Sequence, residues 1–301
     1  MNILITGASG LVGSALVEIL HSKGHSVFSL QRNKTNPQSG FWNFTRISSS
    51  GASPAHFDAV IHLAGENIAT GRWTKRKKER ILKSRVEGTR ELAKYCAALP
   101  QKPEVFISAS AIGFYGNQGD KILDESSASG SNFVAEVCRQ WEQAAQPARD
   151  AGIRVVNGRI GMVLSGKGGT LATMLPSFKL GIAGIVGDGT QYVSWVAIDD
   201  LISMFLFILE TPSITGAVNL VSPEPVTNYQ FTKTLGTVLN RPTLFKMPAF
   251  AARALFGQMG EELVLSSTRV IPGVLQAQNY RFVSPDLKET LHHCLTGTSS
   301  T

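Results

Sequence analysis

The chain has 301 residues, of which 43% are hydrophobic and 17% charged, and this composition excludes a disordered or coiled-coil protein. No apolar run reaches the roughly 20 residues of a membrane span, and no signal peptide is readable, so we expect a cytoplasmic protein without a membrane partner. Much of the net charge of +7 lies between residues 75 and 85, where basic residues go all round a predicted helix instead of lining one face. We interpret this segment as a solvated helix and expect no nucleic-acid partner.

The first half of the chain alternates short apolar runs with segments of helical periodicity. Strands are predicted at residues 2–6, 25–31, 41–44, 58–63, 104–110 and 153–159, and helices at 11–20, 73–98 and 132–149. Residues 35–54, rich in Ser, Gly, Asn and Pro, are expected to be a long surface connection. Such regular alternation indicates an α/β fold with a doubly wound parallel sheet.

The pattern changes after Arg159. Residues 161–189 contain eight glycines, which predicts a binding loop with one short helix near 171–180. Residues 193–196, 199–209 and 217–221 predict a return to the sheet, and the chain from 227 onward alternates helices with Pro-marked turns. We expect a larger domain at 1–165 and about 193–225, with a smaller, mainly helical C-terminal substrate lobe at about 166–192 and 226–301.

A glycine-rich sequence, Gly7-Ala-Ser-Gly10-Leu-Val-Gly13, lies between the first strand and the first helix. A bound dinucleotide requires glycine where the chain turns sharply, where the backbone approaches the pyrophosphate and where the helix packs on the strand. The N–H groups and the dipole of the helix N-terminus then face the phosphates. The larger domain is therefore predicted to be of Rossmann type, with cofactor contacts from Gly7, Ser9, Gly10, Leu11, Val12 and Gly13.

The end of the second strand predicts which dinucleotide is bound. An acidic residue there would bond the ribose 2′-hydroxyl of NAD, whereas a cation would accommodate the 2′-phosphate of NADP. The chain has Gln31 and Arg32 at this place, with no acid nearby. A guanidinium can donate two parallel hydrogen bonds to a phosphate, so we predict NADP(H); the alternative is an exposed strand-end arginine.

Further motifs follow in order: Asp58-Ala-Val-Ile-His-Leu-Ala-Gly65, Val86-Glu-Gly-Thr89, and Phe106-Ile-Ser-Ala-Ser110 followed by Tyr115-Gly116. With the glycine turn they resemble the extended short-chain dehydrogenase/reductases, which include nucleotide-sugar epimerases and dehydratases. More narrowly, Leu63-Ala-Gly-Glu-Asn67, Trp141-Glu142 and the segment 187–191 resemble the "epimerase family" branch, with its C-terminal domain of unknown function, over residues 1 to about 293. The resemblance implies an NADP-binding Rossmann fold, and the matching positions add Leu63, Ala64, Gly65, Arg85, Ser108 and Arg159 as cofactor contacts.

The acid–base pair of that family is not found at its expected place. In the family, a Tyr four residues before a Lys exchanges a proton with the substrate, from the helix after the fourth strand. The matching positions here hold Phe133 and Val137, which cannot titrate. Tyr229 and Lys233 have the right spacing but fall about 120 residues after the serine that they should accompany, in the C-terminal lobe, and we interpret them as structural.

Two residues remain as candidates for the chemistry. Ser110 stands at the position of the hydroxyl that bonds a substrate carbonyl, and the Tyr115 phenol could approach the nicotinamide. The alternatives are a strand-end serine that bonds backbone and a packed loop aromatic. Met162 and Val193 replace an Asn and a diphosphate-clamping Arg that epimerases commonly carry, so nucleotide-sugar epimerisation by the usual mechanism is not expected.

Other candidate residues are interpreted as structural. The three cysteines, Cys96, Cys138 and Cys294, lack CxxC spacing, so neither a metal site nor a disulfide framework is expected. His62 lies within an apolar strand and is interpreted as a core or strand-end histidine with its hydrogen bonds satisfied. Asp199 is interpreted as the N-cap of the following helix.

Two functional hypotheses follow from the sequence. The first is an NADP(H)-dependent oxidoreductase or epimerase-like enzyme that acts on an unknown small molecule without the usual Tyr/Lys pair. The second is a catalytically silent NADP(H)-dependent sensor or interaction protein. The sequence names neither the substrate nor the oligomeric state.

Overall fold

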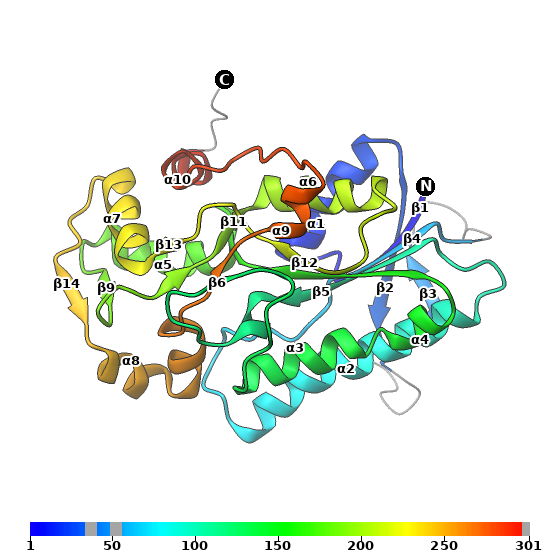
Figure 1. Cartoon of the computed structure of the whole chain (residues 1–301), viewed down its shortest axis with the longest axis horizontal. Coiled ribbons are helices and arrows are strands. Elements are labelled where there is room, and N and C mark those ends of the chain that lie inside the picture. The colour runs from blue at the N-terminus through cyan, green and yellow to red at the C-terminus, as the bar shows by residue number, and fades with distance from the viewer. Residues whose placement is uncertain (34–40, 49–55, 297–301) are drawn as a thin grey trace.

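A seven-stranded sheet forms the centre of the protein (Figure 1). The computed structural model describes residues 1–33, 41–48 and 56–296, and the strand order is β12-β7-β5-β4-β1-β2-β3. The strands are β1 (Asn2–Thr6), β2 (Ser26–Arg32), β3 (Trp42–Ser48), β4 (Ala59–His62), β5 (Val105–Ala111), β7 (Arg154–Ile160) and β12 (Gly216–Leu220). With helices on both faces, the molecule has the predicted doubly wound α/β fold.

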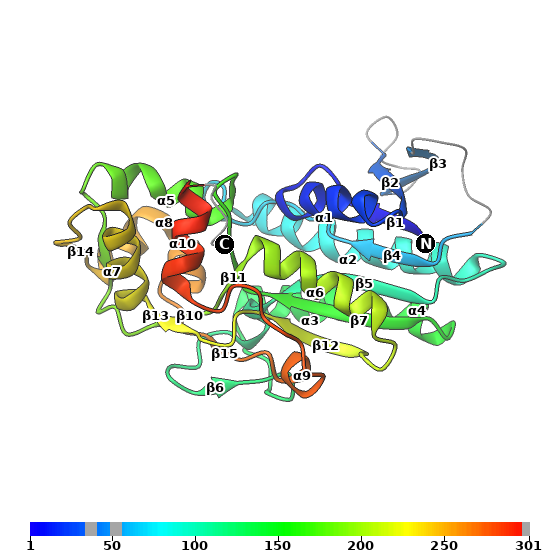
Figure 2. The same ribbon diagram turned by 90° about the horizontal axis from the view of Figure 1, so that it is seen from above.

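Each face of the sheet is apolar because successive side chains of a strand point to opposite sides. On one face, α1 (Leu11–Ser22) and α6 (Ile198–Glu210) cover Ile3, Ile5 and Ile61 (Figure 2). On the other, α2 (Lys75–Ala98), α3 (Phe133–Gln143) and α4 (Gln146–Asp150) cover Leu4 and Phe106. These two layers place the carboxyl ends of β1, β4 and β5 at one edge of the sheet.

The edge strand β3 departs from the prediction, because it runs antiparallel to β2, with a register shift just before Arg32. It is attached to α2 instead of entering a parallel crossover. The Glu91 carboxylate accepts hydrogen bonds from Phe41 N (2.6 Å) and Trp42 N (3.0 Å), and Trp42 Nε1 donates to Gly88 O (2.6 Å). Most of the predicted connection at 35–54 lies outside the described residues.

The remaining elements form a smaller, mainly helical lobe at one end of the sheet (Figure 2). They include α5 (Gly169–Lys179), β9 (Gly184–Val186), α7 (Asn228–Leu239), β14 (Phe245–Met247), α8 (Ala249–Phe256), the single turn η3 (Gly260–Val264) and α10 (Leu287–Thr296). Leu171, Trp195, Phe231 and Leu291 form its core. In the described part of the chain, no helix combines the length and apolar character needed to cross a bilayer. The proposed domain boundaries stay a prediction.

Two predictions about the return to the sheet are wrong. Residues 193–196 do not join it: β10 (Tyr192–Val193) pairs with β13 (Val226–Thr227), and β11 (Trp195–Ala197) pairs with β8 (Met162–Leu164). Asp199 does not cap α6, because that position is Ala197. Asp199 lies in the first turn instead, where its carboxylate is 3.3 Å from Nε2 of His293 on α10.

Candidate cofactor and active site

The loop between β1 and α1 is so tight that two of its glycines have no room for a side chain. Gly7 has φ of +75°, and an added Cβ would lie 2.9 Å from Ala64 N; at Gly13 it would lie 2.1 Å from Gly7 O. Gly10 and Ser9 are exposed, and a Cβ on Gly10 would meet only Gly7 O, at 3.3 Å. The loop is therefore closed toward the protein and open above Gly10, as a pyrophosphate site requires.

The first turn of α1 presents backbone donors to this open side. The first intrahelical bond runs from Ser14 N to Gly10 O (2.8 Å), so the N–H groups of Leu11, Val12 and Gly13 precede it. No acidic residue lies in this turn. Unsatisfied N–H groups together with the positive end of the helix dipole suit a phosphate anion.

The end of β2 lies beside this turn, since Leu30 pairs with Thr6 in the parallel register. Gln31 and Arg32 follow, and both side chains are exposed. The Arg32 guanidinium lies over the Phe41 ring, 5.6 Å from its centroid. This position suits a group that meets an adenosine 2′-phosphate.

The loop after β4 is bonded to the end of β1. Leu63 N donates to Thr6 O (3.1 Å), and Ala64 N donates to Thr6 Oγ1 (3.3 Å). Thr6 Oγ1 in turn lies 2.6 Å from His62 Nδ1. His62 is fully buried, and burial, followed by the charges of Arg85 and Arg32, lowers its pKa to about 3. As predicted, His62 is a core histidine, and it links the two loops of the candidate site.

Arg85 braces the same loop from α2. Its guanidinium packs so close to Gly65 that a Cβ added there would lie 3.2 Å from the guanidinium carbon. The guanidinium also stacks over the Trp141 ring, 4.9 Å from the ring centroid. Nη1 donates to Glu66 O (3.0 Å) and Ile81 O (3.3 Å); among the described residues, Nε and Nη2 donate to none. Burial lowers the pKa of Arg85. Arg85 thus places a cation against Gly65, with donors left for an anion.

A network of polar side chains, here called the Arg159 cluster, lies at the ends of β5 and β7. Arg159 Nε and Nη2 donate to Glu142 Oε1 (2.8 Å) and Oε2 (3.0 Å), and Nη1 donates to Tyr115 OH (3.0 Å). Ser110 Oγ donates to Glu142 Oε1 (2.8 Å), and Tyr115 OH donates to Asn219 Oδ1 (2.7 Å). The structure therefore brings together Ser110, Tyr115 and Arg159, and it pairs each of them internally.

This pairing affects the predicted roles. Tyr115 has no exposed surface, and burial raises its pKa, so the phenol is a poor proton donor in this arrangement. Arg159 is 4% exposed, with its guanidinium over the Phe114 ring. Ser108 is fully buried, and its Oγ donates to Ala109 O (3.3 Å). Cofactor or substrate contacts of these side chains stay predictions that their positions do not favour. Ser110 is also buried, at 3% exposed, and bonds both Glu142 and Cys138, but a hydroxyl can accept a hydrogen bond as well as donate one.

Phe133 and Val137 place no titratable group beside this cluster. Phe133 begins α3, with its ring edge-to-face against Trp73 (5.4 Å) and under the Lys78 ammonium (5.2 Å). Val137 is buried. Burial raises the pKa of Cys138 to about 12, as expected of an unreactive thiol.

The second Tyr and Lys pair lies away from this cluster. Tyr229 and Lys233 lie on α7 in the C-terminal lobe, where Lys233 Nζ donates to Thr243 O (3.1 Å). In the described ranges, the cysteines are free and no group of His, Cys, Asp or Glu could hold a metal ion.

Glu142 is the main residue that sequence reasoning missed, since it was noted only within the motif Trp141-Glu142. It adjoins the apolar face of α3, next to Val137, Cys138 and Trp141. A carboxylate at the margin of a buried helix face needs a partner of opposite charge. Arg159, which follows the apolar residues of β7, was the sequence signal that could have indicated this partner.

Comparisons with known proteins identify the family of the chain. Residues 3–220 match the family model "NAD dependent epimerase/dehydratase family", and residues 247–294 match a domain of unknown function, DUF1731. "Epimerase family protein Mb2239" of Mycobacterium bovis is 38% identical, covering 98% of this chain and 97% of its own length. The crystal structure of human epimerase family protein SDR39U1 with NADPH has a TM-score of 0.88 at 30% identity, covering 99% of this chain and 100% of that one. A nucleoside-diphosphate sugar epimerase from Corynebacterium glutamicum has a TM-score of 0.77 at 36% identity, over 98% of this chain and 58% of its own.

Proposed function

Since the chain belongs to the NAD dependent epimerase/dehydratase family, we propose that it is an NADP(H)-dependent oxidoreductase or epimerase-like enzyme that acts on a small molecule without a Tyr/Lys pair. The observation that carries the proposal is the contrast between the open N–H groups of α1 and the tight packing beneath them at Gly7 and Gly13. NADPH in the human SDR39U1 structure and the exposed Arg32 support NADP over NAD.

The residues present fit the cofactor. The N–H groups of Leu11, Val12 and Gly13 would hold the pyrophosphate, Arg32 the 2′-phosphate, and the loop at Ala64 and Gly65, braced by Arg85, would support the remaining part. When bound, the nicotinamide supplies or accepts a hydride. The protein itself must then orient the substrate and move one proton.

Ser110 and Glu142 provide a route for that proton. Because Ser110 Oγ donates to Glu142 Oε1, its lone pairs can accept a proton from a substrate hydroxyl while its own proton passes to the carboxylate. Reduction would run the same two transfers backward. Arg159 fixes Glu142 in the orientation that this relay needs, through bonds from Nε and Nη2.

The test is a screen of carbonyl compounds for NADPH oxidation, followed by three variants. Ser110→Ala and Glu142→Gln should each lower kcat by roughly 10²- to 10⁴-fold with NADPH affinity unchanged. Tyr115→Phe, the matched control within the cluster, should lower kcat by less than about tenfold. Turnover that Ser110→Ala leaves intact would contradict the relay. Tight NADPH binding without turnover of any compound would contradict the enzyme.

A further inference from the structure

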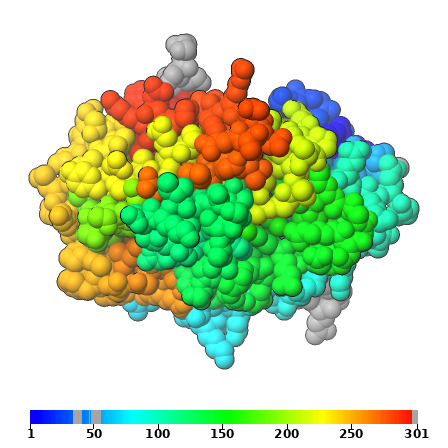
Figure 3. Space-filling model, viewed as in Figure 1, coloured from blue at the N-terminus to red at the C-terminus, as the bar shows by residue number. Residues whose placement is uncertain are grey.

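Exposed apolar side chains gather at the outer end of the C-terminal lobe. In the described part of the chain, twelve large hydrophobic side chains are strongly exposed, and six of them, with exposures of 59–81%, lie there. The six are Leu180, Ile182, Leu244, Phe245, Phe250 and Leu255. They come from the end of α5 and from β14 and α8, which lie at the left end of the molecule in Figures 1 and 3. We call this surface the lobe tip.

The elements of the lobe tip are held together as one surface. β14 pairs in parallel with β9, so that Phe245 lies opposite Gly184, and Pro242 packs against Gly181. On α8, the buried Ala252 faces the protein, while Phe250 and Leu255 remain exposed. An exposed apolar surface of this kind marks a contact with another molecule or a membrane.

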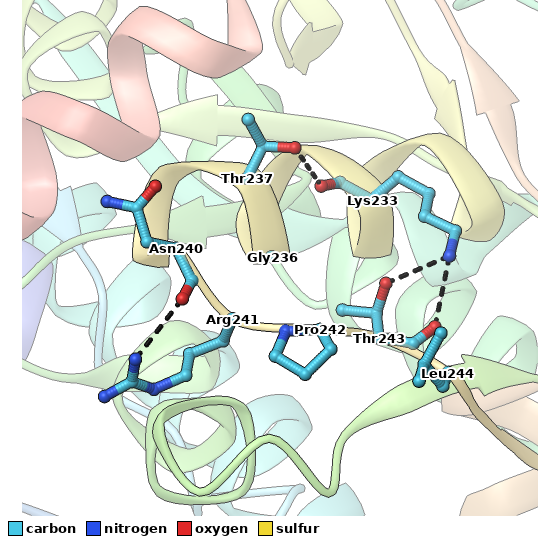
Figure 4. Close-up of a pocket in the computed structure, with 8 residues that line it drawn as sticks. All are labelled: Lys233, Gly236, Thr237, Asn240, Arg241, Pro242, Thr243 and Leu244. Carbon is cyan, nitrogen blue, oxygen red and sulfur yellow. Dashed lines mark hydrogen bonds between the residues drawn. The ribbon is translucent and has the colours of Figure 1, made fainter.

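The charges around the lobe tip are mainly positive, and the nearest acids along the chain, Glu261 and Glu262, follow α8. Residues 225–260 contain four Lys or Arg and no Asp or Glu, and Lys179 adds a fifth cation. A hollow of about 550 Å³ opens beside Leu244, between Lys233 and Arg241 (Figure 4). Arg241 Nε donates to Lys179 O (2.8 Å), which fixes the guanidinium at this rim. Of the five cations, only Arg253 forms a salt bridge within the described residues, with Glu261.

A second basic surface adjoins the lobe tip, at the N-terminal end of α2. Residues 72–85 have a net charge of +7, equal to that of the whole chain. Lys75, Arg76, Arg80 and Lys83 are exposed. The first turn contains no acid, although positive charge there opposes the helix dipole. Arg80 and Lys83 form salt bridges with Glu66 and Glu87, but helix stability does not account for Lys75 and Arg76.

Two hydrogen bonds join this basic surface to α8 and the turn after it. Arg72 Nη2 donates to Ala254 O, and Lys78 Nζ donates to Gln258 Oε1 (3.1 Å). In Figure 1, α8 and the N-terminal end of α2 both lie toward the lower left, and the two hydrogen bonds place the cations of α2 next to α8.

We propose that the lobe tip and the basic end of α2 dock on an anionic lipid surface. Phe250 and Leu255 would enter the boundary between headgroups and acyl chains, while the surrounding cations meet lipid phosphates. In a twofold dimer the same patch of both copies forms the interface. The cations of one copy would then face the cations of the other and repel them. A nucleic acid would neutralise the cations but leave the aliphatic side chains without partners. The expectation of no membrane partner rested on the lack of a spanning segment, which a surface contact does not need.

The test is co-sedimentation of the full chain with vesicles of phosphatidylcholine, with and without about one-third phosphatidylglycerol. Partitioning onto the anionic vesicles should be at least about tenfold stronger than onto neutral ones, and should fall as salt is raised. Equal partitioning, or none onto either vesicle, would overturn the proposal.

Matched pairs of variants test which surface of the protein binds the vesicles. Phe250→Asp should lower partitioning at least about tenfold, whereas Val283→Asp, at a 64% exposed residue of another surface, should lower it less than about twofold. On α2, Arg76→Glu should weaken partitioning, and Lys94→Glu, nearer the other end of the helix, should not. Thermal unfolding and NADPH binding check that each variant is folded. Equal effects of the paired variants, or a dimer in sedimentation equilibrium that Phe250→Asp dissociates, would overturn the proposal.

Discussion

The glycine turn and the Arg159 cluster lie at the same edge of the sheet, yet they are completed in opposite ways. At the turn, backbone packing excludes side chains beneath Gly7 and Gly13 while the N–H groups above remain open. In the cluster, Arg159, Glu142 and Tyr115 satisfy one another; Arg159 and Tyr115 are buried, and Glu142 is partly buried. The turn leaves N–H donors that a ligand can bind, whereas the donors and acceptors of the cluster are already paired with one another.

This contrast separates binding from chemistry. Open donors that no side chain can reach are suited to a phosphate, and they can bind it without rearrangement. A paired cluster instead stabilises the fold, and only a group with a bond to exchange, such as the Ser110 hydroxyl, is placed to act on a substrate. The predictions below alter one region at a time.

The largest effect is expected from opening the Arg159 cluster. Glu142→Ala leaves the Arg159 guanidinium buried without its carboxylate, which should lower the free energy of unfolding by roughly 3–5 kcal/mol. Urea unfolding measures the change. Glu142→Gln keeps a hydrogen-bond acceptor and should cost less. A loss below about 1 kcal/mol for Glu142→Ala would mean that the cluster does not stabilise the fold.

Filling the space above the turn should abolish binding. Gly10→Val should raise the Kd for NADPH at least about a hundredfold, or roughly 2.7 kcal/mol, and change the free energy of unfolding by less than about 1 kcal/mol. Calorimetric titration and urea unfolding measure both. Gly13→Ala is the contrasting variant: its Cβ would lie 2.1 Å from Gly7 O, so it should destabilise the fold itself. Tight binding by Gly10→Val would place the phosphates elsewhere.

The buried His62, which lies beneath the glycine turn, should make the stability of the protein depend on pH. Its folded pKa of about 3 lies below the unfolded value of 6.5, so between these values the unfolded chain binds more protons. The free energy of unfolding should therefore fall by about 1.4 kcal/mol per unit as the pH decreases from about 6 to about 4. Urea unfolding across this range should show that His62→Gln removes this slope, while the exposed His21→Gln does not. Identical slopes in wild type and His62→Gln would show that His62 titrates normally.

The smallest effect concerns cofactor preference. Arg32→Ala should raise the Kd for NADPH about tenfold, or about 1.4 kcal/mol, because one charge-assisted contact to the 2′-phosphate is lost. The Kd for NADH, measured in the same variant, should stay unchanged and serves as the control. An equal loss for both dinucleotides would assign Arg32 to the fold.

The sheet and the cofactor turn could be predicted because their signals are local. Glycines at fixed offsets between a strand and a helix permit few structures, and burial of His62 follows from its apolar strand. The antiparallel direction of β3 could not be predicted, since it depends on hydrogen bonds to Glu91, about 50 residues away.

The Arg159 cluster shows why the catalytic side was harder to predict. Position alone suggested Tyr115 as a proton donor and Arg159 as a cofactor contact, but their partners, Asn219 and Glu142, come from separate elements. Pairing over such distances leaves no spacing signal in a single sequence. The same holds for Asp199, whose partner His293 lies on the last helix.

The edge position of β3 also bears on how cofactor preference can change. Arg32 and the Phe41 ring beneath it belong to a peripheral hairpin that contacts the body of the sheet through β2 and is attached to α2 through Glu91. Neither residue takes part in the packing beneath the glycine turn. Gln31 and Arg32 could therefore be exchanged for an acidic strand end while the candidate phosphate site is kept, so that we expect specificity for one dinucleotide to be alterable independently of the capacity to bind any.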